Sequence, residues 1–280
     1  MDTHAMKPLP TSFEQIERFL KKRNIDTGAI AFYNDPNFLA AEQSEPAFLE
    51  FYAVYVRLRD RDAAYDTLVR SIVPRMVAKL ADEIQRDGQK GVCIDASMML
   101  MKMLELHGVW SYAINGALTI HSPSLPSPTH FWPIDVAPVA GHVWLVVPPY
   151  EIVDVSLACQ PYFRGEQTFL PPYLVAEGGK RIMPQATDYC SSELLAKLRE
   201  EHGPLPKDIH YRLNPGLQRR VEYFPSYEVV SGTAKLHYCA GGVSASDAPS
   251  LQAIQSRRWN GLLAGELYDQ VIKPELSAAK

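Results

Sequence analysis

Residues Val92–His107 are apolar on almost every side when they are read as a helix. Apolar residues cover too much of the circumference for a surface helix, which shows only one apolar stripe. Gly88 closes the helical segment before this stretch, and Gly108 ends the stretch itself. A helix of this kind has to be enclosed by other elements, so it is predicted to lie at the centre of the fold.

The periodicity changes from helix to strand after Gly108. β-Branched and aromatic residues alternate in several short runs, which is typical of strands. Between two of the runs, Pro148–Tyr150 is a suitable three-residue hairpin connection. The expected strands span Val109–Ile120, His142–Val147, Glu151–Val155, Tyr227–Val230 and Ala234–Cys239. We therefore predict an α+β fold in which a buried, cysteine-bearing helix packs on an antiparallel sheet.

Further helices and one long loop are expected around this core. Ser12 and Gln15 form a capping-box pattern, Asn34–Asn37 reads as a turn, and Pro74 is expected to kink or divide its helix. The five prolines of Ser122–Pro138 are too many for a sheet interior and predict a long ordered loop or lid. The expected helices span approximately Phe13–Lys22, Pro46–Asp60, Ala63–Arg86, Ser191–Glu201, Ser250–Arg257 and Asn260–Val271.

The length of 280 residues fits one large domain. Within it we expect a central core over residues 61–160. An N-terminal helical layer is expected over residues 1–60 and a C-terminal elaboration over residues 161–280.

Composition excludes several classes of protein. Apolar residues make up 46% of the chain and charged residues 21%, which is ordinary for a globular protein. The net charge of −4 and the scattered Lys and Arg residues argue against a nucleic-acid partner. Neither a signal sequence nor an apolar stretch of bilayer length is found, so we expect a cytoplasmic protein without a membrane partner. The four cysteines form no CxxC pair, which argues against a zinc knuckle and a disulfide framework.

Cys93 lies in the first turn of the apolar helix, shortly after Gly91. Unpaired backbone N–H groups and the helix dipole at such an end favour a thiolate over a thiol, so a reactive cysteine is well placed here. Asp95, in the same turn, works partly in the opposite direction through its charge. The alternative is a structural role, because free cysteines are often buried as small apolar residues. The same structural role is the simplest reading of the other three cysteines.

His142 and Asp154 are expected to meet across the predicted hairpin. If Pro148–Tyr150 forms the loop, Trp144 faces Asp154, and His142 lies on the same face at the diagonal position. Asp154 stands in a β-branched run that should be half buried, where a carboxylate needs a hydrogen-bond donor. A register shift of one residue would instead place the two side chains on opposite faces.

The three residues together predict an activated nucleophile. A carboxylate bonded to one imidazole nitrogen fixes the tautomer and leaves the other nitrogen free to take a proton from a thiol. This reasoning assigns Cys93 as the nucleophile, His142 as the base and Asp154 as the residue that orients the base.

A family resemblance rests on four motifs. They are Gly91-Val92-Cys93 at a helix start, Leu104-Glu105-Leu106-His107-Gly108-Val109, Gly141-His142-Val143-Trp144 and Val153-Asp154. Together they resemble the core of the transglutaminase-like cysteine-peptidase superfamily, over roughly residues 88–156. The resemblance implies a papain-like core in which the helix packs on an antiparallel sheet, with Cys93, His142 and Asp154 as the catalytic triad and no cofactor.

Three further residues are weaker site candidates. The side-chain amide of Gln89 is a candidate second donor of an oxyanion hole, beside the backbone N–H of Cys93. His130 and Trp144 are candidate substrate contacts, although a loop role for His130 and a core role for Trp144 are the simpler readings. His121, His130 and His142, with Asp135 among them, lack the short fixed spacing of metal ligands, so no metal site is expected.

The chemistry expected of this chain is thiol-dependent acyl transfer from an amide. A cysteine peptidase or amidase is the first expectation, with a peptide, protein or small amide as substrate. Transglutaminase-type transfer to an amine, or deamidation, is the alternative within the same chemistry. The alternative from a different class is a non-catalytic binding module on the same core. The oligomeric state and the identity of the substrate are left open.

Overall fold

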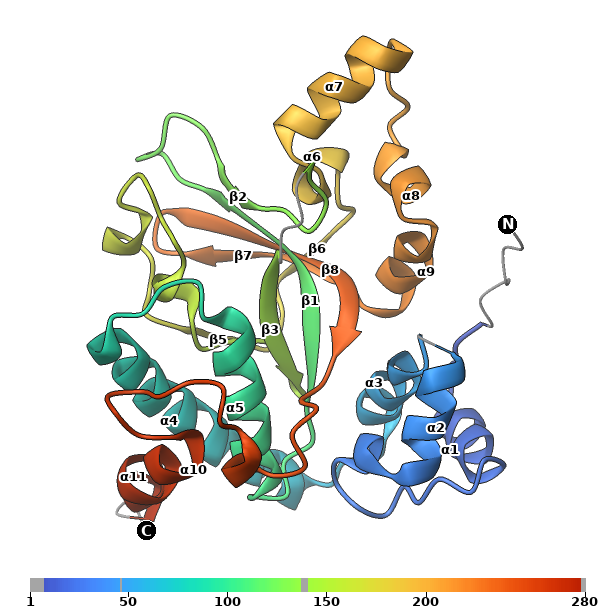
Figure 1. Ribbon diagram of the computed structural model, residues 1–280, viewed down its shortest axis with the longest axis vertical. Coiled ribbons are helices and arrows are strands. Elements are labelled where there is room, and N and C mark those ends of the chain that lie inside the picture. Colours follow the sequence, from blue (N-terminus) through green and yellow to red (C-terminus); the bar gives the residue numbers. More distant parts are fainter. Residues whose placement is uncertain (1–7, 46, 137–140, 278–280) are drawn as a thin grey trace.

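A computed structural model describes residues 8–45, 47–136 and 141–277. Within these residues eight strands form one curled antiparallel sheet (Figure 1) in the order β5-β4-β3-β1-β8-β7-β6, with β2 paired to β1. The strands are β1 (Tyr112–His121), β2 (Thr129–Phe131), β3 (His142–Val147), β4 (Tyr150–Asp154), β5 (Leu174–Ala176), β6 (Lys180–Ile182), β7 (Ser226–Ser231) and β8 (Ala234–Ser244). The α+β class and the antiparallel sheet are thus as the sequence predicts.

The helices lie in three groups around this sheet (Figure 1). Helices α4 and α5 form one group with the C-terminal helices. Helices α1–α3 form a second group, and α6–α9 form a third. Helix α5 packs directly on β3 and β1. The helices are α1 (Phe13–Lys21), α2 (Pro36–Ser44), α3 (Leu49–Leu58), α4 (Ala63–Asp87), α5 (Cys93–Glu105), α6 (Ala186–Tyr189), α7 (Ser192–His202), α8 (Ile209–Leu213), α9 (Pro215–Tyr223), α10 (Ala264–Leu267) and α11 (Lys273–Ser277).

Local capping sets the ends of the long helix that leads to the site. The Asp62 carboxylate accepts a hydrogen bond from the Tyr65 N–H at 2.7 Å, so α4 begins at Ala63. Gly88 adopts a left-handed conformation with φ of 77° and ends the helix. Pro74 lies inside α4, which continues through it as one helix of 25 residues, so the expected division does not occur.

The expected turn at Asn34–Asn37 proves to be the start of a helix. The Asp35 carboxylate accepts hydrogen bonds from the N–H groups of Asn37 and Phe38, and Pro36 occupies the first helical position. A proline at this position loses no intrahelical bond, because the first N–H groups of a helix have no partner. The helix expected from Pro46 is α3, which begins at Leu49; Pro46 itself is outside the described residues.

Two other expectations need correction. The proline-rich stretch Ser122–Pro138 is not loop throughout, because Thr129–Phe131 forms β2 and pairs with β1; its last residues, 137 and 138, are outside the described residues. The helix expected at Ser250–Arg257 is reduced to a 3₁₀ turn at Leu251–Ala253. Prolines are rarely found in the interior strands of a sheet, but a proline-rich segment can contain a short strand at the sheet edge.

The hairpin of β3 and β4 has a tighter turn than expected. Its connection is Pro148-Pro149, joined by a cis peptide bond, and Val147 pairs with Tyr150. A register shift then follows, so that Leu145 pairs with Val153. This second pairing is the register that a three-residue connection would have produced, so the bulge compensates for the shorter turn.

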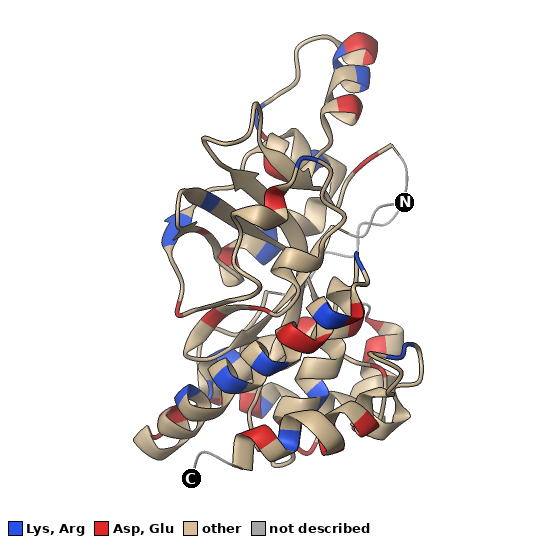
Figure 2. Cartoon of the chain, turned by 90° about the vertical axis from the view of Figure 1, so that its left-hand side faces the viewer, with Lys and Arg blue, Asp and Glu red and all other residues tan. Residues whose placement is uncertain are grey.

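Two apolar clusters pack against the sheet. The main core extends from Leu9 in the N-terminal layer to Leu276 near the end of the described chain, and it includes the buried face of α5. A smaller cluster around Tyr189 and Leu217 packs α6–α9 against Ala117 of β1 and Cys239 of β8. Figure 2 shows charged residues of both signs interspersed along the helices. None of the helices in the described ranges has the length and apolar character needed to cross a bilayer.

Candidate active site

Cys93 is the first residue of α5 and is 5% exposed. Gly91 precedes it with φ of 68°, a backbone conformation that favours glycine, and donates its N–H to the Cys159 carbonyl at 2.8 Å. This bond fixes the loop that leads into the helix. As the first helical residue, Cys93 has a backbone N–H that takes no part in the intrahelical bonding, and its thiol lies at the positive end of the helix dipole.

His142 and Asp154 meet across the hairpin, as the sequence predicts. Imidazole Nε2 lies 2.7 Å from Asp154 Oδ2, and both side chains are completely buried. Because a carboxylate only accepts hydrogen bonds, Nε2 carries the proton. The other ring nitrogen, Nδ1, is buried and has no hydrogen-bond partner within the described residues. Nδ1 is therefore the nitrogen left to exchange a proton with another group.

The imidazole is electrostatically suited to carry a positive charge. Burial alone would lower the pKa of His142, but the charge of Asp154 and its hydrogen bond outweigh burial. The Cys93 side chain lies near enough to act in the same direction, and the pKa of His142 rises to about 10. A positively charged imidazole carries a proton on each ring nitrogen, so Nδ1 is then a hydrogen-bond donor.

Asp154 is held by two residues that sequence reasoning missed. Oδ1 accepts a hydrogen bond from the Ser156 N–H at 3.0 Å, and Oδ2 accepts one from the Tyr238 hydroxyl at 2.9 Å. The Asp-x-Ser spacing of 154–156 is a turn signal that the sequence offered. Tyr238 is 84 positions away on β8, and no local pattern connects it to Asp154. Together these bonds fix the carboxylate that orients His142.

Three aromatic rings surround the imidazole of His142. Phe131, Trp144 and Tyr238 each have a ring centroid 6.2 Å from that of His142. The Trp144 ring lies at 24° to the imidazole and is 3% exposed. Trp144 therefore shields the His142–Asp154 pair from water and has little surface to offer a substrate.

The charge of Asp95 is balanced by the C-terminal segment. Its carboxylate forms an ion pair with the Arg257 guanidinium at 3.0 Å and accepts a hydrogen bond from the Ser256 hydroxyl at 3.1 Å. An acidic residue near the thiol would otherwise oppose a thiolate. The ion pair with Arg257 compensates the charge of Asp95.

The side-chain amide of Gln89 is engaged away from the thiol. Its Nε2 donates to the Asp87 carboxylate and to the Arg258 carbonyl, and its Oε1 accepts from Arg257. An amide nitrogen has only two protons, so both are used. In this arrangement Gln89 offers no free N–H as the second donor of an oxyanion hole, and the backbone N–H of Cys93 is the donor that remains.

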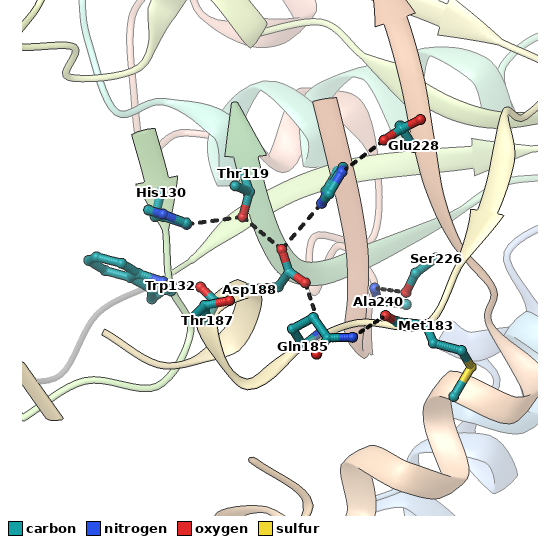
Figure 3. A network of polar contacts seen from close by, with 11 residues as sticks. Thr119, His130, Trp132, Met183, Gln185, Thr187, Asp188, Ser226, Glu228 and Ala240 are labelled. Carbon is teal, nitrogen blue, oxygen red and sulfur yellow. Dashed lines mark hydrogen bonds and ion pairs between the residues drawn. The ribbon is translucent and has the colours of Figure 1, made fainter. Parts of the chain in front are cut away.

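His130 lies on the opposite face of the sheet from His142. On β1 Gly116 pairs with His142 and Thr119 pairs with His130, and positions three apart on a strand point to opposite faces. His130 Nδ1 lies 3.1 Å from the Thr119 hydroxyl, which in turn donates to Asp188 (Figure 3). Its ring stacks on Trp132. The structure therefore does not bring this candidate substrate contact to the Cys93 site.

The other cysteines have different surroundings from Cys93. Burial raises the pKa of the Cys159 thiol, raises that of Cys190 to about 11, and raises that of Cys239 well above its ordinary value. All four cysteines are free and buried. Across the described ranges, no three His, Cys, Asp or Glu side chains gather closely enough to hold a metal ion.

Comparisons with known proteins add no relative. No protein-family model, no curated protein and no solved structure matches the chain.

Proposed function

We propose that this protein is a cysteine hydrolase or acyltransferase that acts on an amide through Cys93, His142 and Asp154. The observation that carries the proposal is the buried His142–Asp154 hydrogen bond of 2.7 Å, with Nδ1 left without a bonded partner near a thiol at a helix start. The resemblance of residues 88–156 to the transglutaminase-like core supports the same assignment.

The reaction would begin with attack of the Cys93 thiolate on the amide carbonyl carbon. The backbone N–H of Cys93 would stabilise the oxyanion of the tetrahedral intermediate. The C–N bond then breaks, His142 gives the proton on Nδ1 to the leaving amine, and the acyl group remains on sulfur as a thioester. The other proton stays on Nε2 throughout and is donated to Asp154, which holds the imidazole in position.

In the second half of the reaction an acceptor takes the acyl group. His142 Nδ1 removes a proton from a water molecule or an amine, which attacks the thioester and releases the Cys93 thiolate. With water the reaction is hydrolysis, as in a peptidase or amidase. With an amine it is transfer, and the low exposure of Cys93 and His142 favours this second candidate, because a shielded thioester survives longer in water.

Alkylation with iodoacetamide near neutral pH tests the proposal. We expect stoichiometric modification of Cys93 ahead of the other three cysteines, located by peptide mass spectrometry. In His142→Ala the rate at Cys93 should fall at least about tenfold, since an unassisted thiol is only a few per cent ionised at this pH. His202→Ala, a change at an exposed histidine, is the matched control and should keep the rate.

Two results separate the candidate functions. Equal, slow modification of all four cysteines would reject the enzyme and favour a non-catalytic binding module. If Cys93 is selective, incubation with a pool of peptide amides should yield a Cys93 thioester that hydroxylamine removes. The ratio of hydrolysed to amine-linked product, with and without added putrescine, then distinguishes hydrolysis from transfer.

A further inference from the structure

Two loops meet beside the candidate active site through Arg164. Its guanidinium donates to the carbonyl oxygens of Ser127 and Pro128, each at 3.0 Å, and to the Thr129 hydroxyl at 2.6 Å. The Ser127 hydroxyl accepts a further bond at 2.9 Å. One side chain thus joins the proline-rich segment to the loop that follows β4.

Glu166 also takes part in this contact. Its carboxylate, which is 1% exposed, accepts the Thr129 hydroxyl at 2.5 Å and the Arg164 N–H at 2.8 Å. Burial opposes ionisation of Glu166, but these hydrogen bonds and the charge of Arg164 lower its pKa. We call Ser127–Thr129, Arg164 and Glu166 the clasp.

The clasp holds two aromatic residues that reach the site. Phe131, two residues after Thr129, lies on the same face as His142 and contacts its imidazole. Tyr162, two residues before Arg164, packs edge-on against Phe131 with ring centroids 5.7 Å apart and donates to the Leu157 carbonyl at 2.5 Å. Its environment includes the charge of Asp154. The clasp therefore fixes the positions of rings that border the His142–Asp154 pair.

We propose that the clasp and the Phe131–Tyr162 pair form a gate that restricts the acyl donors reaching Cys93 to slender groups unless the clasp opens. This inference rests on the proposed function and adds a determinant of its substrate class. Joined by several charge-assisted hydrogen bonds, the loops hold the aromatic pair closed. A bulky acyl group would have to separate the rings and break these bonds, whereas a linear chain would not.

Two alkylating reagents with the same reactive group test the gate. The rate constants of Cys93 with iodoacetamide and with 5-iodoacetamidofluorescein are measured, and their ratio is divided by the ratio for glutathione. We expect the protein to disfavour the bulky reagent more than glutathione does. We call this glutathione-corrected ratio, iodoacetamide over the bulky reagent, the discrimination. In Arg164→Ala the discrimination should fall about tenfold, because charge-assisted hydrogen bonds that hold the closed state are lost.

Control variants isolate the clasp. Phe163→Ala changes a neighbouring residue that is 92% exposed and outside the clasp, so it should keep the discrimination of the unaltered protein. Thr129→Val removes the hydroxyl shared by Arg164 and Glu166 with little change in shape, and should show a smaller loss of discrimination. Circular dichroism establishes that each variant is folded, and Thr129→Val decides the result if Arg164→Ala does not fold.

The possible outcomes distinguish the gate from the proposed function. A glutathione-like ratio in the unaltered protein, or an unchanged ratio in folded Arg164→Ala and Thr129→Val, would overturn the gate while Cys93 remains reactive. An equal loss in Phe163→Ala would also overturn it, because general loosening of the loop would then explain the change. Slow reaction of Cys93 even with iodoacetamide in every variant would overturn the proposed function instead.

Discussion

The hydroxyl of Tyr238 binds the same oxygen of Asp154, Oδ2, that binds the imidazole of His142. Strand β8 thereby takes part in orienting an imidazole that lies on β3. The two donors converge on one carboxylate oxygen, and all three side chains are fully buried. Loss of either hydrogen bond would leave a buried polar group unsatisfied and lower the free energy of unfolding.

Removal of this hydroxyl should leave His142 bonded to Asp154 but hold the carboxylate and the imidazole less firmly. In Tyr238→Phe we expect slower alkylation of Cys93 and a loss of about 1–2 kcal/mol in the free energy of unfolding, the usual range for a buried hydrogen bond. Urea unfolding and the iodoacetamide rate measure the two effects. Tyr189→Phe removes a comparable buried bond, to the Ala240 carbonyl on the other face, and should lower stability alone. Equal loss of reactivity in both variants would contradict a positioning role for Tyr238.

The charge of Asp154 should determine how stability changes at alkaline pH. The pKa of His142 is raised from 6.5 to about 10, so its contribution to stability is complete below pH 6.5 and is lost as the pH rises through about 10. Asp154→Asn removes the charge that raises this pKa. We expect the variant to be less stable near neutral pH and to lose less stability between pH 7 and 10, as measured by thermal unfolding. Parallel curves for the two proteins would show that this pair does not set the dependence.

Acid should destabilise the fold through His130. Burial lowers the pKa of His130 from 6.5 to about 4, against the opposing charge of Asp188. The unfolded chain therefore binds a proton that the folded protein does not, and stability falls as the pH drops from about 6.5 to 4. His130→Gln should make this fall shallower in urea titrations at fixed pH. His202→Gln, at an exposed position, is the control and should leave the slope unchanged.

Gly116 lies where three strands leave no room for a side chain. A Cβ atom there would lie 2.1 Å from the Cys239 carbonyl oxygen and 2.8 Å from the Trp144 ring. Gly116 is on β1 and pairs with His142 of β3. We expect Gly116→Ala to lower the free energy of unfolding by about 1–3 kcal/mol or more, because overpacking displaces the backbone. Gly242 lies on β8, where that strand pairs with β1, and a Cβ atom added there would be 3.9 Å from its nearest neighbour. Gly242→Ala should therefore cost much less, and similar losses would contradict the steric explanation.

The sequence was most informative where the signal is local. The apolar pattern located α5 and placed Cys93 in its first turn, and the alternation around Pro148-Pro149 brought His142 to Asp154. The predicted turn length of the hairpin was wrong, but the predicted pairing beyond the turn was confirmed because the bulge restored the expected register. Periodicity and turn chemistry act within a few residues, so they could be read without a structure.

What the sequence did not reveal depends on distant segments. Tyr238 reaches Asp154 only because β8 pairs with β1, a long-range pairing that no local pattern encodes. His130 was misplaced because β2 is three residues long within a proline-rich stretch, so its side of the sheet is set by pairing with β1. The amide of Gln89 is engaged by the distant Arg257 and Arg258, which sequence reasoning could not anticipate.

The position of β8 between β1 and β7 imposes an order on biosynthesis. The ribosome makes Cys93, His142 and Asp154 long before residues 234–244, and until these emerge β1 has an unpaired edge and Asp154 lacks its tyrosine partner. The nascent polypeptide thus carries Cys93, His142 and Asp154 before the strand that completes the hydrogen bonds of Asp154 has been made.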